Sequence, residues 1–229
     1  MYEVRFYKGD YSERQRRANA DEAIAYVEHH FNSTSSPTAE YTVVITGSNA
    51  SQISRNWGRW YAQAISREFA VPIGGDQGIK VGGYDGRGDG NLRHTDMPAI
   101  LLEPLFVSNP RHAEIVRSED GQMRMARVLV DSIKRFFPDG GLIAFSVGHK
   151  YKTSNPSDRG ASLVGGGTEA EFAEKVLLKA ETMLHGVTAP DEERHVRVVK
   201  GEETLLDEVI DEDAQIVWDP ERCLLRIVG

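Results

Sequence analysis

Short apolar runs, separated by segments with helical periodicity, constrain the fold of this chain more than any other feature. Most of these runs are bounded by polar residues or glycines, which is typical of buried strands. Apolar residues at helical spacing over residues 51–69 indicate an amphipathic helix, and further helices are expected at 110–117, 122–136 and 168–184. This combination indicates an α/β fold. The strands are expected at residues 2–7, 23–27, 42–46, 99–102 and 142–147.

Two polar or glycine-rich segments lead to more local expectations. Ser12-Glu13-Arg14-Gln15 has the pattern of a capping box, which predicts a helix that continues to about Ala20. The density of glycine over residues 74–90 predicts a mobile loop. This loop is not a phosphate-binding motif, because no strand directly precedes it and no helix start follows it.

The length of 229 residues accommodates one sizeable α/β domain with a small appendage. We place the main domain at residues 1–185. The remainder, 186–229, is expected to be a small C-terminal extension of unknown role. It contains short β-like runs at residues 195–199, 216–218 and 224–228.

Composition excludes several classes of protein. With 40% hydrophobic and 27% charged residues the chain is typical of a globular protein. The sequence contains no apolar run of about 18 residues, the length that a membrane-spanning helix needs. The formal charge of −8 argues against nucleic-acid binding, which needs clustered lysine and arginine. Because Cys223 is the single cysteine, the chain can form no internal disulfide and no thiolate-rich metal site. Histidines and carboxylates must hold any metal that binds.

Candidate functional residues stand where three of the apolar runs end. Residues 23–27 are followed by Glu28-His29-His30, residues 99–102 by Glu103, and residues 142–147 by Gly148-His149. In open α/β sheets, ligands bind in the crevice beyond the carboxyl ends of the strands. One histidine near an apolar segment is more often structural than metal-bound. Three such endings in one domain favour a shared site.

Longer motifs connect these endings to a known family. Residues 98–109, Pro-Ala-Ile-Leu-Leu-Glu-Pro-Leu-Phe-Val-Ser-Asn, preceded by Leu-Arg-His-Thr at 92–95, resemble the signature around the catalytic glutamate of zinc-dependent N-acetylmuramoyl-L-alanine amidases of the amidase-3 type. The Arg-x-x-x-Ala-Asn pattern at 14–19 and the segment 30–33 are similar to the stretch in which that family places a zinc-binding histidine. The resemblance implies a mixed twisted sheet flanked by helices, of the phosphorylase/hydrolase-like kind.

The remaining family elements occur in an unexpected place. Gly148-His149, the loop with Asp158-Arg159-Gly160-Ala161, and Thr168-Glu169 resemble the family's first strand, its Gly-His loop and its metal-binding glutamate. The family order would place this block before residue 14. The resemblance therefore implies a circularly permuted catalytic domain, rejoined through residues 137–141. Compact domains tolerate such rearrangement because their termini often lie close together.

Carried over position by position, the resemblance implies that His30, His149 and Glu169 bind Zn²⁺ and that Glu103 is the catalytic carboxylate. For two of these ligands, a nearby residue of the same type could bind the metal instead. His29 competes with His30, although the Phe-Asn that follows favours His30. Glu171 competes with Glu169, although the apolar spacing along the helix favours Glu169.

The implied reaction is hydrolysis of the bond between N-acetylmuramic acid and L-alanine in bacterial peptidoglycan. Two imidazoles and one carboxylate leave a zinc site partly open, and water bound there has its pKa lowered to about 7. Glu103 would accept the proton of this water and return it to the leaving nitrogen, while zinc polarises the carbonyl. Arg93 and His94 could line the substrate groove or be ordinary loop residues.

Other interpretations stay open at this stage. The chain could be another zinc hydrolase of the carboxypeptidase or aminopeptidase kind, or a catalytically inactive module that binds peptidoglycan. His149 and Glu169 could also complete the site of a neighbouring chain. The N-terminus has no apolar stretch typical of a signal peptide. We therefore expect synthesis in the cytoplasm and release onto the cell wall during lysis, as for a phage or prophage endolysin.

Overall fold

The computed structural model describes residues 1–186, 194–200, 203–210, 215–219 and 224–228. The chain forms two compact units, residues 1–186 and 187–229. In the second unit β9 (Arg194–Lys200) pairs antiparallel with β10 (Glu203–Ile210), and β11 (Gln215–Asp219) pairs antiparallel with β12 (Leu224–Val228). The three β-like runs of the sequence coincide with β9, β11 and β12, whereas β10 was not expected because acidic residues interrupt its apolar ones. Cys223 lies outside the described residues.

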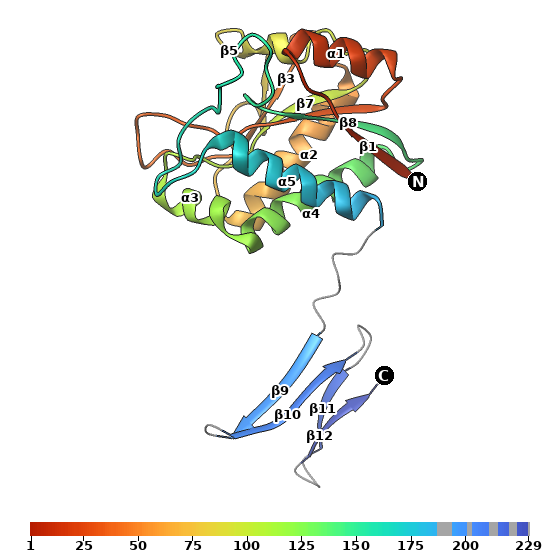
Figure 1. Cartoon of the computed structure of the whole chain (residues 1–229), viewed down its shortest axis with the longest axis vertical. Helices are drawn as coiled ribbons and strands as arrows, with labels where there is room; N and C mark the ends of the chain where they lie inside the picture. The colour runs from red at the N-terminus through yellow and green to blue at the C-terminus, as the bar shows by residue number, and fades with distance from the viewer. Residues whose placement is uncertain (187–193, 201–202, 211–214, 220–223, 229) are drawn as a thin grey trace. The chain divides into compact units, whose positions relative to one another are not determined.

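A six-stranded sheet with the order β1-β8-β2-β7-β3-β4 forms the centre of the first unit (Figure 1). The pairs β1–β8, β8–β2, β2–β7 and β3–β4 are parallel, and β7–β3 is antiparallel. This confirms the predicted mixed α/β sheet. Its strands are β1 (Tyr2–Phe6), β2 (Ala25–His29), β3 (Val43–Thr46), β4 (Ile79–Val81), β7 (Ala99–Glu103) and β8 (Gly141–Val147).

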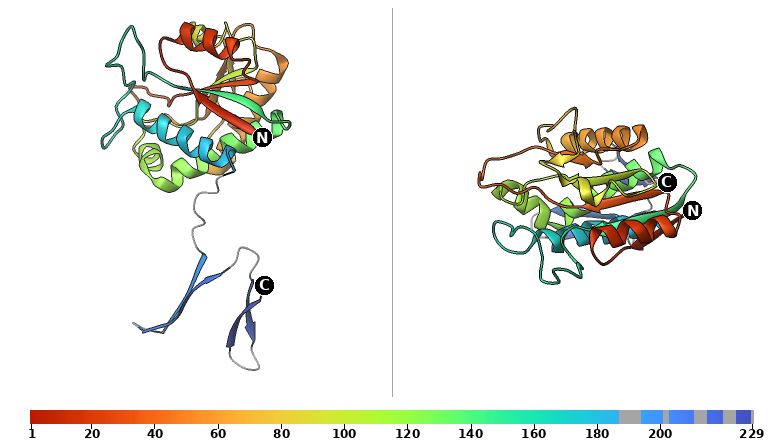
Figure 2. Two further views of the ribbon diagram at one scale, coloured as in Figure 1. Left: turned by 45° about the vertical axis from the view of Figure 1, so that its right-hand side comes forward. Right: turned by 90° about the horizontal axis from the view of Figure 1, so that it is seen from above.

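Helices cover the two faces of this sheet unequally, as Figures 1 and 2 show. The larger apolar cluster joins α2 (Gln52–Phe69), α4 (Glu119–Phe136) and α5 (Glu169–Leu184) to strand residues such as Ile100. The smaller cluster, which includes Leu101, lies under α1 (Tyr11–Ala20) and the segment after the short helix η1 (Asp89–Asn91). Neighbouring strand residues thus alternate between the faces. Helix α3 (Pro110–Arg117) precedes α4.

The structure corrects two predictions near the starts of helices. Helix α1 begins at Tyr11, and Asp10 before it makes no side-chain capping bond. The capping box at Ser12 was therefore wrong, because Ser12 lies inside the helix. Ile53, the first apolar residue of the helical pattern at 51–69, was expected to be buried but is 50% exposed, because it lies in the first turn of α2.

The glycine-rich segment expected as a loop contains short strands. Besides β4 it forms the hairpin of β5 (Gly83–Tyr84) and β6 (Arg87–Gly88). Gly83 has a φ of +72°, and a Cβ there would collide with the carbonyl oxygen of Arg87. Glycine is needed at this position because only glycine allows so close an approach of the two strands.

Within the described residues, no helix has the length and apolar character needed to cross a membrane.

Candidate metal and catalytic site

Three parallel strands end side by side at one edge of the sheet, and each carries a candidate side chain there. Strand β2 pairs in parallel with both β7 and β8, so the carboxyl ends of all three meet. His30 follows β2, Glu103 is the last residue of β7, and His149 comes two residues after β8. A hydrogen bond from Gly148 N to His29 O (2.9 Å) continues the pairing beyond the strands. The topology therefore gathers residues that are far apart in the sequence.

Glu169, the first residue of α5, completes a cluster with the two histidines. Its Oε1 lies 2.8 Å from Nδ1 of His30 and 3.3 Å from Nε2 of His149. One ligand atom from each of the three residues lies within 4.8 Å of the others. Glu169 is held in place by hydrogen bonds from Phe31 N to Oε1 (3.2 Å) and from Ala161 N to Oε2 (3.0 Å). The cluster forms within one chain.

The nitrogen of each imidazole that faces away from Glu169 contacts a further carboxylate. Nε2 of His30 lies 2.7 Å from Oε1 of Glu28, and Nδ1 of His149 lies 3.0 Å from Oδ1 of Asp158. Lys152 Nζ donates to Asp158 at 2.8 Å. Such carboxylate partners orient imidazole ligands in metal sites.

Two glycines allow the side chains of the cluster to approach the backbone. A Cβ on Gly148 would lie 2.5 Å from Cε1 of His30, and a Cβ on Gly160 would lie 2.5 Å from Oε2 of Glu169. Gly160 also has a φ of +69°, which disfavours other residues. Position 148 of the Gly-His motif therefore needs glycine, because the ring of His30 occupies the space that a Cβ would fill.

Glu103 faces the same cavity as the cluster. The cavity has a volume of about 570 Å³, and Glu103, His30, His149 and Glu169 all contribute to its lining. Oε2 of Glu103 is buried and has no hydrogen-bond partner among the described residues. Because Glu103 lines the cavity, this oxygen can be satisfied by a molecule bound there. The cavity also reaches the β5–β6 hairpin, where it meets Arg87.

Burial and ion pairing displace the pKa values of these groups in opposite directions. Burial raises the pKa of Glu103 to about 8, and the neighbouring charge of Glu169 adds to the rise. Burial also acts on Glu169, but hydrogen bonds from His149 and His30 hold its pKa far below the ordinary value. The pKa of His30 is raised despite its burial, because Glu169 and Glu28 both accept hydrogen bonds from it. The pKa values of two carboxyls in one cavity are thus displaced in opposite directions.

The donor set suits a zinc ion. Two imidazole nitrogens and one carboxylate oxygen, with a fourth position open, are the ligands of many catalytic zinc sites. Carboxylates gather around the two imidazoles, and a divalent cation would offset their negative charge. The chemistry of the residues therefore fits the predicted metal.

The competing residues stay outside the cluster. His29 points to the opposite side of β2, is fully buried and has no hydrogen-bond partner for either ring nitrogen among the described residues. Burial lowers its pKa to about 3, so it is a neutral core residue. Glu171 is paired with Lys175 at 2.9 Å on the exposed side of α5.

Arg93 and His94 do not line the cavity that holds Glu103. Arg93 instead lies 3.6 Å from Asp89 and donates to Nε2 of His94 at 3.1 Å. This favours their interpretation as ordinary loop residues.

The roles of Glu28 and Asp158 were not predicted from the sequence. A signal for Glu28 was present, because a carboxylate that directly follows an apolar run and becomes buried with it must have a partner. Asp158 carries no such signal, since an acidic residue in a polar loop is usually solvated. Tyr11, whose hydroxyl accepts a hydrogen bond from His149 N at 3.1 Å, was also missed.

The chain is similar to proteins of one known family. A family model described as N-acetylmuramoyl-L-alanine amidase matches residues 3–135. Similar solved structures include the catalytic domain of CwlV, an N-acetylmuramoyl-L-alanine amidase from Bacillus (Paenibacillus) polymyxa var. colistinus, with 27% identity and a TM-score of 0.47. An N-acetylmuramoyl-L-alanine amidase from Clostridium difficile 630 has 24% identity and a TM-score of 0.48. Both alignments cover 56% of this chain and 66% of the other chain, just under two thirds of it. A comparison with curated proteins gives no match.

Proposed function

The chain belongs to the amidase-3 family of N-acetylmuramoyl-L-alanine amidases, and we propose that it hydrolyses the amide bond between N-acetylmuramic acid and L-alanine in peptidoglycan with a zinc ion. The observation that carries this proposal is the convergence of His30, His149, Glu169 and Glu103 on one cavity. An inactive peptidoglycan-binding module would need no such convergence of ligand and acid–base groups. Release from a lysing cell as an endolysin stays a prediction.

In this mechanism the cluster holds the cation and Glu103 moves the proton. His30, His149 and Glu169 would bind Zn²⁺, which supplies the Lewis acidity that makes water more acidic and an amide carbonyl more electrophilic. Glu103 accepts a proton from the water that attacks the carbonyl carbon. It donates this proton to the alanine nitrogen as the carbon–nitrogen bond breaks. Burial raises the pKa of Glu103, which makes its carboxylate a stronger proton acceptor in the first step.

The test of this function is to digest purified peptidoglycan and to identify the new chain ends by mass spectrometry. We expect stem peptides that begin with a free L-alanine amino group. Treatment with a chelator should abolish their release and added Zn²⁺ should restore it. New reducing sugars or cleaved peptide cross-links would instead assign the chain to another class of hydrolase.

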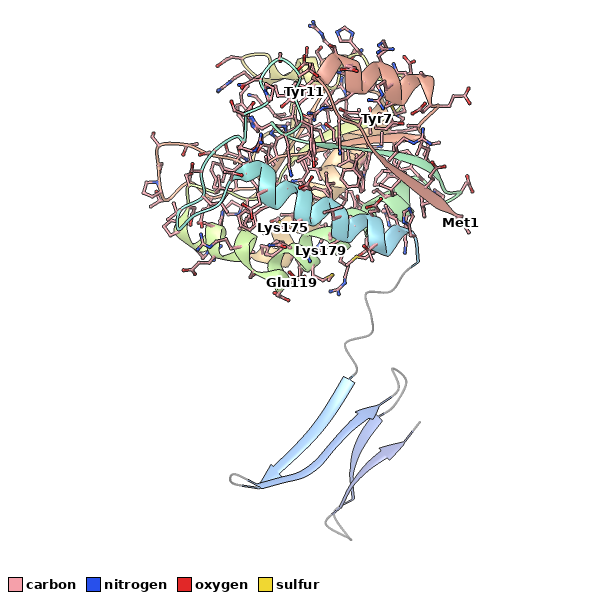
Figure 3. All side chains as sticks on the ribbon, in the orientation of Figure 1. Met1, Tyr7, Tyr11, Glu119, Lys175 and Lys179 are labelled. Atoms are coloured by element: carbon pink, nitrogen blue, oxygen red, sulfur yellow. The ribbon has the colours of Figure 1, made fainter. Side chains whose placement is uncertain are left out.

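We also propose that the catalytic domain is circularly permuted. The family match ends at residue 135, before β8 and α5, which carry His149 and Glu169. Strand β8 nevertheless lies between β1 and β2 in the sheet. Helix α5 packs against β1, and Figures 2 and 3 show the N-terminus and Met1 close to the carboxyl end of α5. A chain that ran from α5 directly into β1 would need only a short link.

Reordering the chain tests the permutation. A variant with residues 139–186 placed before residues 1–138, joined by a short glycine linker, should fold and bind Zn²⁺ as the control does. The control is residues 1–186 in their present order. Circular dichroism and zinc titration of both proteins provide the comparison. A reordered chain that fails to fold, beside a folded control, would contradict the proposal.

A further inference from the structure

Glu28 is a buried carboxylate that the proposed reaction does not use. It lies in β2 and is fully buried. Because it stands two residues before His30, both side chains project from the same face of the strand. This is the face covered by α1, onto which the catalytic cavity opens. A carboxylate in this position is costly unless every oxygen is satisfied.

Both oxygens of Glu28 have hydrogen-bond partners that fix its orientation. Oε1 contacts Nε2 of His30 at 2.7 Å and accepts from Asn91 Nδ2 at 2.6 Å. Oε2 accepts from Ser146 Oγ at 2.9 Å and more weakly from the hydroxyl of Tyr26 at 3.4 Å. These partners come from β2, β8 and η1. Three elements therefore hold one carboxylate against one imidazole.

Arg14 supplies the compensating charge and connects Glu28 to the second histidine. This arginine is fully buried and donates to Ser146 Oγ at 2.8 Å and to Val147 O at 2.7 Å. It also donates to Lys150 O, so its guanidinium bridges the two sides of the turn that carries His149. His149 has a φ of +62° in this turn, a strained conformation that needs support. One network thus fixes the backbone near His149 and the side chain of His30.

We propose that Glu28 is a positioning residue that holds His30 with its proton on Nε2, so that His30 presents Nδ1 to the metal. The two histidines then differ in the nitrogen they offer. In His30, Nδ1 faces Glu169 and Nε2 faces Glu28. In His149, Nε2 faces Glu169 and Nδ1 faces Asp158. The inference rests on the proposed metal site but not on the identity of the substrate.

Zinc affinity of the full chain tests this role. We expect Glu28→Gln to weaken Zn²⁺ binding, measured by competition with a chromophoric chelator, by about 10- to 100-fold. The amide has the shape of the carboxylate but lacks the charge that stabilises the imidazole proton. The control is Asp21→Asn, which removes a carboxylate bound by Arg5 and Tyr7 at the end of α1. Its zinc affinity should equal that of the wild type.

A second measurement needs no variant. Long-range ¹H–¹⁵N NMR of the zinc-loaded wild type should show His30 protonated at Nε2 and His149 protonated at Nδ1. Protonation of His30 at Nδ1, or unchanged zinc affinity in a folded Glu28→Gln protein, would overturn the inference while leaving the metal site intact. A wild type that binds no Zn²⁺ at all would overturn the metal site, and this inference with it.

Discussion

Replacing Glu103 with glutamine should lower amide hydrolysis about 10²- to 10⁴-fold, because the amide can neither accept nor return a proton. The loss should appear in kcat, measured as the release of stem peptides from peptidoglycan. Zinc affinity should stay within a few-fold of the wild type, because Glu103 is not one of the three clustered ligands. This separation of catalysis from metal binding distinguishes an acid–base residue from a ligand.

The fold should survive this substitution. Oε2 of Glu103 has no partner among the described residues, and burial already favours the neutral form of this carboxyl. A neutral amide of the same shape therefore breaks few interactions. Glu171→Gln, a change on the exposed side of α5, is the matched control and should retain full activity. A Glu103→Gln enzyme of near-normal kcat would exclude Glu103 as the proton acceptor.

Replacing His149 with alanine should abolish tight zinc binding and, with it, peptidoglycan hydrolysis. Loss of an outer partner of a ligand costs about 10- to 100-fold in metal affinity, so loss of the ligand itself should cost more than about 100-fold. Elemental analysis of the purified protein and chelator competition would measure the effect. Activity should fall in parallel with the metal content.

His149 is a better choice than His30 for this test because of their burial. The side chain of His149 is 29% exposed, whereas that of His30 is 8% exposed and lies between Glu28 and Glu169. Removing His30 would leave two buried carboxylates facing each other, which threatens folding. His185→Ala, at the exposed end of α5, is the control for a general effect of losing a histidine. Normal zinc content in His149→Ala would exclude this residue as a ligand.

Much of the fold could be predicted from the sequence because its strands are strongly apolar. The runs at 99–102 and 142–147 correspond closely to β7 and β8. The direction of β3 could not be predicted, because periodicity does not say whether a strand runs parallel or antiparallel to its neighbour. The hairpin at 83–88 was missed because its strands are only two residues long and consist mainly of glycine and polar residues.

The location and the ligand residues of the candidate site could be predicted, but the contacts that support these residues could not. Residues at strand ends pointed to one edge of the sheet, and the resemblance to a family supplied the choice of His30 and Glu169. Their roles stay predictions, although the structure brings them together with His149. The contacts of Glu28 and Arg14 could not be predicted. They join α1, β2 and β8, which are far apart in the sequence, and local sequence patterns do not predict such contacts.

The separation of the cluster residues along the chain has a consequence for biosynthesis. His30 and Glu169 are 139 residues apart in sequence, so a growing polypeptide carries the first of them long before the last. Closing so long a loop is entropically unfavourable until β8 has joined the sheet. A nascent or prematurely terminated chain therefore lacks the complete ligand cluster. The complete cluster, and any zinc binding that depends on it, should therefore arise only after translation has passed α5.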